Sequence, residues 1–136
     1  MSQPITYVDT SALAKLFLPE QETAFLREWL DANTTVLATS NLTTTELLRA
    51  CRKRSPLLVP RAQTVLSGIF RIPLSSDICY SAGVAVPLPL KSLDALHVAT
   101  ALYLGEDVKG MLTYDKQMIA SARAAGLATF SPGALD

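Results

Sequence analysis

Residues 92–115 have the sequence SLDALHVATALYLGEDVKGMLTYD, which contains the signals of a helix, a turn and a strand in succession. Residues 92–104 are strongly apolar and lack proline, so they predict a buried helix, and Gly105 is a typical residue for ending one. Residues 110–114 have the composition of a short strand, and a further helix is predicted over 115–125. Helices that alternate with strands in this way are typical of α/β domains.

The same alternation extends toward the beginning and the end of the chain. Strands are also predicted over residues 5–8, 35–39, 71–74 and 128–130, and helices over residues 11–18, 20–31, 42–54, 61–70 and 76–86. Strands joined through helices pair in parallel by right-handed crossovers. The sequence therefore predicts an α/β fold with a mostly parallel central sheet and helices on both faces. A length of 136 residues is that of one domain, covering residues 1–136.

The composition limits the class of protein. Twelve basic and twelve acidic residues give a net charge of zero, and 49% of the residues are hydrophobic. This excludes a disordered chain and a protein that coats nucleic acid without specificity, although a nuclease with a local basic patch remains compatible. Cys51 and Cys79 lack metal-site or redox spacing and are expected to be buried thiols. Because no apolar stretch approaches the length of a membrane span, we expect a cytoplasmic protein.

Acidic residues occur where predicted strands end and helices begin. Asp9 follows the first strand and Asp115 follows the strand at 110–114, while Glu46 and Asp94 lie near the starts of two predicted helices. In an open parallel sheet the carboxyl ends of the strands face one edge, where ligands bind. Carboxylates that cluster there repel one another and need cations or raised pKa values. Oxygen ligands of this kind suit Mg²⁺ or Mn²⁺.

Each acid also has a purely structural explanation. Asp9 and Asp115 are suitable N-caps for the helices that follow them. Asp94 could interact with the dipole of its own helix, although an unpaired carboxylate on this apolar helix is costly. Glu46 could pair with Arg49, three residues later, as a surface salt bridge. Only the four acids taken together favour a functional site.

Four segments resemble the successive motifs of PIN-domain nucleases, and most closely those of VapC-type toxins. They are residues 7–12 (YVDTSA), 45–47 (TEL), 92–101 (SLDALHVATA) and 112–115 (LTYD). The resemblance covers essentially the whole chain and implies a three-layer α/β/α fold. It also implies metal-dependent cleavage of RNA by the toxin of a type II toxin–antitoxin pair, a homodimer, and an antitoxin partner.

The resemblance assigns roles to individual residues. The acidic positions of the family, which are catalytic and bind the metal, correspond to Asp9, Glu46, Asp94 and Asp115. The supporting hydroxyl positions correspond to Thr10, Ser11 and Thr113. In this interpretation one or two Mg²⁺ or Mn²⁺ ions activate water and stabilise the departing oxygen. Asp9 and Asp94 are the preferred direct ligands, and the other two acids bind directly, bind through water, or position the nucleophile.

Two further features have more than one explanation. A stretch without acidic residues begins with four cations, Arg49, Arg52, Lys53 and Arg54. These cations form either a basic rim that holds RNA or a solvated helix face. His97, the single histidine, lies three residues after Asp94, and a packed or hydrogen-bonded structural role is favoured over a catalytic one.

Other functions compete with the toxin hypothesis. A PIN nuclease of RNA maturation or decay and a non-catalytic PIN binding module would share the same motifs. A receiver-like signalling domain also places an aspartate at a strand end, but it requires adjacent early acids and a strand-end lysine. This sequence has a lone Asp9 and no such lysine.

Overall fold

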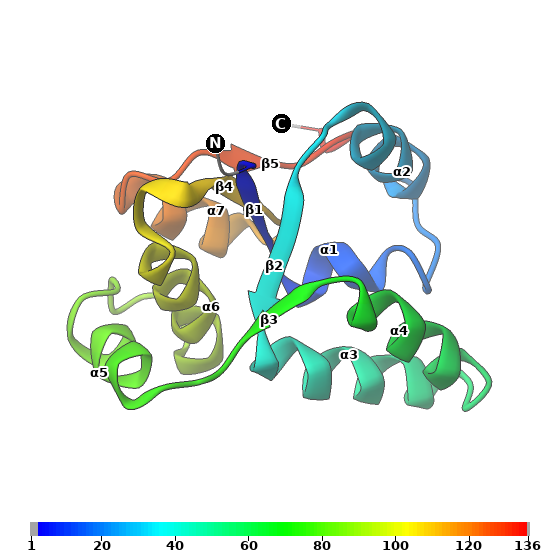
Figure 1. Cartoon of the computed structure of the whole chain (residues 1–136), viewed down its shortest axis with the longest axis horizontal. Coiled ribbons are helices and arrows are strands. Elements are labelled where there is room, and N and C mark those ends of the chain that lie inside the picture. Colours follow the sequence, from blue (N-terminus) through cyan, green and yellow to red (C-terminus); the bar gives the residue numbers. More distant parts are fainter. Residues whose placement is uncertain (1–2, 136) are drawn as a thin grey trace.

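The computed structural model describes residues 3–135, and Figure 1 shows a central sheet surrounded by helices. The elements are β1 (Ile5–Val8), α1 (Thr10–Ala14), α2 (Thr23–Ala32), β2 (Val36–Ser40), α3 (Asn41–Arg54), α4 (Leu58–Ser67), β3 (Phe70–Ile72), α5 (Ser76–Val84), α6 (Ser92–Tyr103), the 3₁₀ turn η1 (Gly105–Asp107), β4 (Val108–Leu112), α7 (Lys116–Ala124) and β5 (Thr129–Phe130). The strands are parallel and lie in the order β3-β2-β1-β4-β5. The predicted α/β fold is confirmed, and β3, which was predicted over residues 71–74, covers Phe70–Ile72 at one edge of the sheet.

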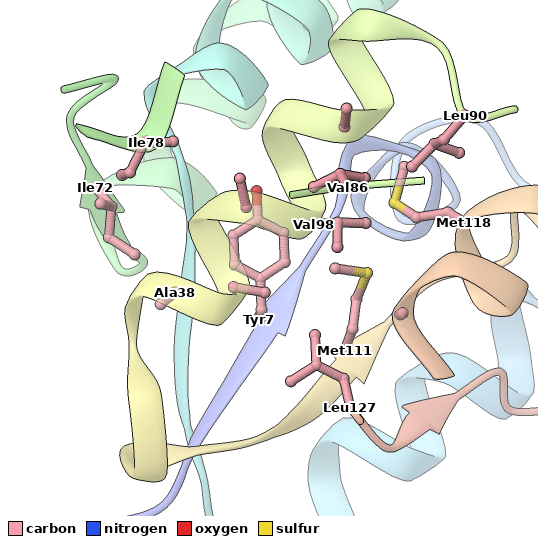
Figure 2. Close-up of a cluster of buried hydrophobic side chains, with 14 residues drawn as sticks. Tyr7, Ala38, Ile72, Ile78, Val86, Leu90, Val98, Met111, Met118 and Leu127 are labelled. Atoms are coloured by element: carbon pink, nitrogen blue, oxygen red, sulfur yellow. The ribbon is translucent and has the colours of Figure 1, made fainter. Parts of the chain in front are cut away.

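Two hydrophobic cores lie on opposite faces of the sheet. Successive residues of a strand point to opposite faces, and the neighbours Tyr7 and Val8 of β1 accordingly belong to different cores. Tyr7 packs with Met111 and Val98 beneath α5, α6 and α7 (Figure 2). Val8 packs with Leu47 of α3 beneath α1 to α4. The sheet is therefore the middle layer of an α/β/α sandwich, with α5 and α6 across the sheet from α3 and α4 in Figure 1.

Strand β4 begins at Val108, two residues earlier than predicted, and its pairing with β1 contains an irregular step. Ile5 pairs with Val108 and Thr6 with Gly110, so the register shifts between these pairs. A Cβ atom on Gly110 would lie 2.6 Å from the Phe130 ring and 2.8 Å from the Ala128 carbonyl oxygen. Glycine at this position therefore allows β5 to approach β4 closely.

The first helix is shorter than the predicted 11–18 and ends at Ala14. In a continuing helix the Lys15 carbonyl would accept from the N–H of residue 19, but Pro19 has none. The Lys15 carbonyl instead accepts a hydrogen bond from the Thr23 hydroxyl at 2.8 Å. The chain therefore leaves the helix and turns into α2.

The helix predicted over residues 61–70 is displaced toward the N-terminus, because α4 begins at Leu58 and ends at Ser67. Pro60 therefore lies in the first turn of this helix and not before it. Proline is tolerated in a first turn because the amide there has no partner within the helix.

The expectation of two buried thiols was wrong for one of them, since Cys51 is buried and Cys79 is exposed. Between residues 3 and 135 no helix has the length and apolar character needed to cross a membrane.

Candidate active site

Two of the predicted acids lie at the carboxyl ends of the neighbouring strands β1 and β4. Asp9 is the N-cap of α1 and accepts a hydrogen bond from the Ala12 amide at 3.0 Å. Asp115 is the N-cap of α7 and accepts one from the Met118 amide at 2.9 Å. Both acids therefore fill the capping role that the sequence left open. Because β1 and β4 are paired, both caps lie at the same edge of the sheet.

A small pocket at this edge brings together the four predicted acids. Its volume is about 60 Å³, and it is lined by Asp9, Thr10, Ser11, Glu46, Asp94, His97, Asp115 and Met118. Helix α3 contributes Glu46 and helix α6 contributes Asp94. Pockets for organic ligands usually measure roughly 300–1,000 Å³. The size of this one suits an ion and water rather than an organic cofactor.

Asp9 is almost completely buried, and both of its carboxylate oxygens have hydrogen-bond donors. Oδ1 accepts from the Ser11 hydroxyl at 2.7 Å as well as from the Ala12 amide, and Oδ2 accepts from the Thr113 hydroxyl. Burial raises the pKa of Asp9, and these hydrogen bonds partly oppose the rise. Thr113 also accepts from the Asp115 amide at 3.2 Å. The two hydroxyls therefore hold the ends of β1 and β4 in a fixed arrangement.

Glu46 enters the pocket from α3 and is bound by two donors at a single oxygen. Its Oε1 accepts from the Thr10 hydroxyl at 2.7 Å and lies 2.8 Å from His97 Nε2. Burial acts to raise the pKa of Glu46, but the hydrogen bonds from His97 and Thr10 outweigh it and the pKa is lowered. Among the salt bridges formed within residues 3–135, Glu46 pairs with His97 and not with Arg49. The alternative of a surface pair with Arg49 was therefore wrong.

Asp94 lies in the first turn of α6 and is partly buried. Burial raises the pKa of Asp94, and the nearby charges of Asp115 and Glu46 raise it further. The interactions with His97 and Lys91 oppose this rise only in part. Asp94 is therefore a carboxylate whose surroundings favour an added positive charge.

The donor set of the pocket matches the preference of a hard divalent cation for oxygen ligands. Four carboxylates and the hydroxyls of Thr10 and Ser11 line the pocket, and its lining residues include no lysine or arginine. Across residues 3–135, no group of three or more His, Cys, Asp or Glu side chains is arranged closely enough to hold a metal ion in this structure. The chemistry of the donors, and the raised pKa of Asp94 in particular, fits Mg²⁺ or Mn²⁺.

Comparison with known protein families identifies the family of this chain. The family model described as PIN domain matches residues 6–125. The chain belongs to the PIN domain family. Ribonuclease VapC47 of Mycobacterium tuberculosis is 38% identical over 133 residues, which cover 95% of this chain and 98% of that protein. Ribonuclease VapC35 of the same organism is 40% identical over 131 residues, covering 93% and 96%.

Solved structures share the PIN fold described above. Mycobacterium tuberculosis VapC20, described as a sarcin-ricin loop cleaving toxin, matches with a TM-score of 0.75 and 18% identity over 93% of this chain and 99% of that one. A toxin–antitoxin complex from Klebsiella pneumoniae matches with a TM-score of 0.72 and 23% identity over 93% and 97%. At these identities the likeness supports the fold alone, and it agrees with the predicted three-layer PIN architecture.

Two residues around the pocket of this PIN domain were missed by the sequence analysis. Met118 lines the pocket, and Tyr7 hydrogen-bonds to the ring of His97 at 2.7 Å. Tyr7 belongs to the first motif, but strand periodicity alone does not say which face of the sheet contains the site. The structural role expected for His97 agrees with its burial and its hydrogen bonds to Tyr7 and Glu46.

The basic residues predicted to hold RNA lie on the same helix as Glu46. Arg49, Arg52 and Lys53 line a shallow depression of about 340 Å³ on α3, and Arg54 ends the helix. Arg49 and Lys53 follow Glu46 by three and seven residues, so they share its side of the helix. The salt bridges formed within residues 3–135 involve none of these cations. The PIN domain therefore presents unpaired positive charge along the helix that also supplies an acid of the pocket.

Proposed function

We propose that this chain is a divalent-metal-dependent endoribonuclease and the toxin of a toxin–antitoxin pair, acting in the cytoplasm. The observation that carries the proposal is the convergence of four carboxylates in one small pocket of a PIN domain, with Asp94 held at a raised pKa. The similarity to proteins named ribonuclease VapC at 38% and 40% identity over nearly the whole chain supports RNA as the substrate.

We propose Asp9 and Asp94 as direct metal ligands. Glu46 and Asp115 bind the metal directly, bind it through water, or position the attacking water. A bound Mg²⁺ or Mn²⁺ supplies a water of lowered pKa and stabilises the departing oxygen. The raised pKa of Asp94 supports its role as a ligand, because a carboxylate in such surroundings gains from a nearby cation.

The other pocket residues arrange these ligands. Ser11 and Thr113 donate to the two oxygens of Asp9, while Thr10 donates to Glu46. Hydrogen bonds of this kind fix the direction in which a carboxylate presents its remaining lone pairs. The hydroxyl residues therefore orient the acids while leaving the centre of the pocket to water and metal.

The RNA backbone binds along α3 in this proposal. The cations Arg49, Arg52, Lys53 and Arg54 attract phosphates without reading base sequence. Arg49 and Lys53 share the side of α3 that carries Glu46, so a strand held there passes the pocket. The scissile phosphate then lies over the acids while flanking phosphates contact the helix.

An antitoxin and a second copy of the chain are the proposed protein partners. A solved structure with this fold is a toxin–antitoxin complex. Large apolar side chains remain exposed on α5 and α6 and between them, as a partner surface requires. They are Tyr80, Val84, Leu88, Leu93 and Tyr103. Light scattering of the purified chain tests the homodimer, and co-purification with the product of a neighbouring small gene tests the antitoxin.

Cleavage of RNA by the Asp94→Asn variant tests the catalytic proposal. The substitution keeps the shape of the side chain and removes its charge. We expect wild-type protein to cut RNA in the presence of Mg²⁺ or Mn²⁺ and to stop when the metal is chelated, and we expect the variant to be inactive. Glu28→Gln, which removes an exposed charge on α2, is the matched control. Wild-type protein that binds RNA but never cuts it would instead indicate a non-catalytic PIN module.

A further inference from the structure

Tyr7 and His97 are buried polar residues that the proposed chemistry does not use. Tyr7 is fully buried in β1, and His97 in α6 is 2% exposed. The Ser40 amide donates to the Tyr7 hydroxyl oxygen at 3.2 Å, and that oxygen lies 2.7 Å from His97 Nδ1. His97 Nε2 lies 2.8 Å from Glu46 Oε1. A continuous hydrogen-bonded chain therefore runs from the end of β2 through the core to the pocket.

The carboxylate at the end of these hydrogen bonds fixes the direction of the last one. An ionised carboxylate oxygen only accepts, so His97 Nε2 carries a proton and donates it to Glu46 Oε1. The Tyr7 oxygen accepts from the Ser40 amide, and burial raises the pKa of Tyr7, so the hydroxyl keeps its proton. The Tyr7 oxygen lies 2.7 Å from His97 Nδ1 and holds the ring in the orientation that points Nε2 at Glu46.

These hydrogen bonds determine which oxygen of Glu46 is available to bind a cation. Oε1 accepts from both Thr10 and His97, which occupies its two lone-pair directions. Oε2 is the oxygen that remains for the pocket. Glutamate is a flexible side chain that loses considerable rotamer freedom when it is ordered. The two donors at Oε1, of which His97 is buried, provide that ordering before any cation binds.

The same hydrogen bonds connect the segments that carry three of the acids. Tyr7 lies two residues before Asp9 in the chain, and His97 lies three residues after Asp94 on α6. Since Glu46 lies on α3, the chain of hydrogen bonds joins β1, α6 and α3. It therefore opposes the separation of acids that repel one another.

We propose that Tyr7 and His97 are positioning residues that hold Glu46 for binding of a divalent cation. The inference rests on the proposed function. Mutating partners of this kind, which orient a ligand without contacting the metal, typically costs about 10–100-fold in metal affinity or activity. His97 acts through its Nε2 donor, and Tyr7 acts by holding the imidazole ring through the hydrogen bond at Nδ1.

Two substitutions of His97 separate positioning from packing. The amide nitrogen of glutamine lies as many bonds from Cβ as Nε2, so His97→Gln keeps a donor toward Glu46. The amide nitrogen of asparagine corresponds to Nδ1, so His97→Asn loses that donor while retaining a polar group near Tyr7. Both variants remove the ring and should lose similar packing. Urea unfolding of the two metal-free variants measures that shared loss.

Calorimetric titration of Mn²⁺ into both variants and wild type tests the proposal. We expect His97→Asn to bind Mn²⁺ about 10-fold more weakly or worse, and His97→Gln to retain most of the affinity. Equal weakening in both variants, with wild-type binding intact, would overturn the positioning role and leave the proposed function standing. A wild-type chain that neither binds Mn²⁺ nor cuts RNA would overturn the proposed function, and the positioning role with it.

A nitrogen-15 spectrum of the imidazole provides a test that needs no His97 variant. His97 is the single histidine of the chain, so its two ring nitrogens give an unambiguous pair of signals. We expect a proton on Nε2 in wild-type protein and a shift of the Nδ1 signal in Tyr7→Phe, because that nitrogen loses its hydrogen-bond partner. A wild-type Nε2 without a proton would overturn the role of His97, and an unchanged spectrum in Tyr7→Phe would overturn that of Tyr7.

Discussion

Replacing Thr113 with valine removes one hydroxyl that serves two neighbours in the pocket wall. Thr113 is completely buried at the end of β4. Its hydroxyl donates to Asp9 Oδ2 and accepts from the Asp115 amide at 3.2 Å. Valine has nearly the same shape and lacks the hydroxyl, so Thr113→Val leaves a buried carboxylate oxygen without its donor and an amide without its acceptor.

The expected loss follows from the kinds of hydrogen bond involved. A hydrogen bond to a charged group contributes about 1.5–3 kcal/mol to stability, and a neutral one about 0.5–1.5 kcal/mol. Losing both should lower the free energy of unfolding by about 2–4 kcal/mol at neutral pH. Thr113→Ser retains the hydroxyl and loses a methyl group, which costs about 0.8 kcal/mol.

The loss should depend on pH in a defined direction. Burial raises the pKa of Asp9 above its unfolded value, so this group lowers stability as pH rises from the unfolded pKa through the folded one. The Thr113 hydrogen bond opposes that rise, and removing it raises the pKa of Asp9 further. The deficit of Thr113→Val should therefore be greatest above the folded pKa of Asp9 and should shrink as the pH falls and the carboxyl group is protonated.

Urea unfolding at several pH values, in metal-free buffer, measures this effect for wild type, Thr113→Val and Thr113→Ser. The valine variant should fall well below the serine variant at neutral pH, and the gap should narrow in acid. A gap that is absent, or that does not change with pH, would refute the claim that Thr113 stabilises a buried ionised Asp9.

Other substitutions test the electrostatics of the pocket, the RNA surface and the sheet. Asp94→Asn should stabilise the metal-free chain toward urea at neutral pH, because it removes a charge that burial, Asp115 and Glu46 disfavour; a less stable variant would contradict this account. Mg²⁺ at 100 times its Kd should stabilise wild type by about 2.7 kcal/mol and leave Asp94→Asn unchanged. The double variant Arg49→Ala with Lys53→Ala should weaken RNA binding. The slope of log K for RNA binding against log salt concentration should become shallower by about 0.7 for each phosphate that is no longer neutralised, while Mn²⁺ binding stays constant as the control. An unchanged slope would indicate that these cations form only a solvated helix face. Gly110→Ala should destabilise the fold by about 1–3 kcal/mol in thermal unfolding because its Cβ meets β5, whereas Gly83→Ala, with open space around it in α5, should stabilise by about 0.5–1 kcal/mol. Equal effects at the two glycines would contradict the close approach of β4 and β5.

The order of elements could be predicted because its signals are local. The apolar run of α6, the glycine that follows it and the short run of β4 identify these elements without tertiary information. The end of α1 depended on a distant partner, since the Lys15 carbonyl is satisfied by Thr23. The position of Pro60 inside α4 was missed because a proline can either precede a helix or lie in its first turn.

The convergence of the acids could also be predicted, but their individual partners could not. Asp9 and Asp115 follow strands, and parallel strands end at the same edge of a sheet. The partner of Glu46 depends on how α3 and α6 are rotated against the sheet, which brings His97 rather than Arg49 to its carboxylate. The hydrogen bond between Tyr7 and His97 joins residues 90 positions apart and has no sequence signal.

The four carboxylates are proposed to form a divalent-metal site at which this protein cleaves RNA. Calorimetric titration of Mn²⁺ into the purified chain and into Asp94→Asn tests this proposal most directly, because it requires no knowledge of the RNA target. We predict binding to wild-type protein that is lost in the variant, with metal-dependent RNA cleavage lost in parallel. A folded wild-type chain that binds no Mn²⁺, with or without RNA present, would contradict the account.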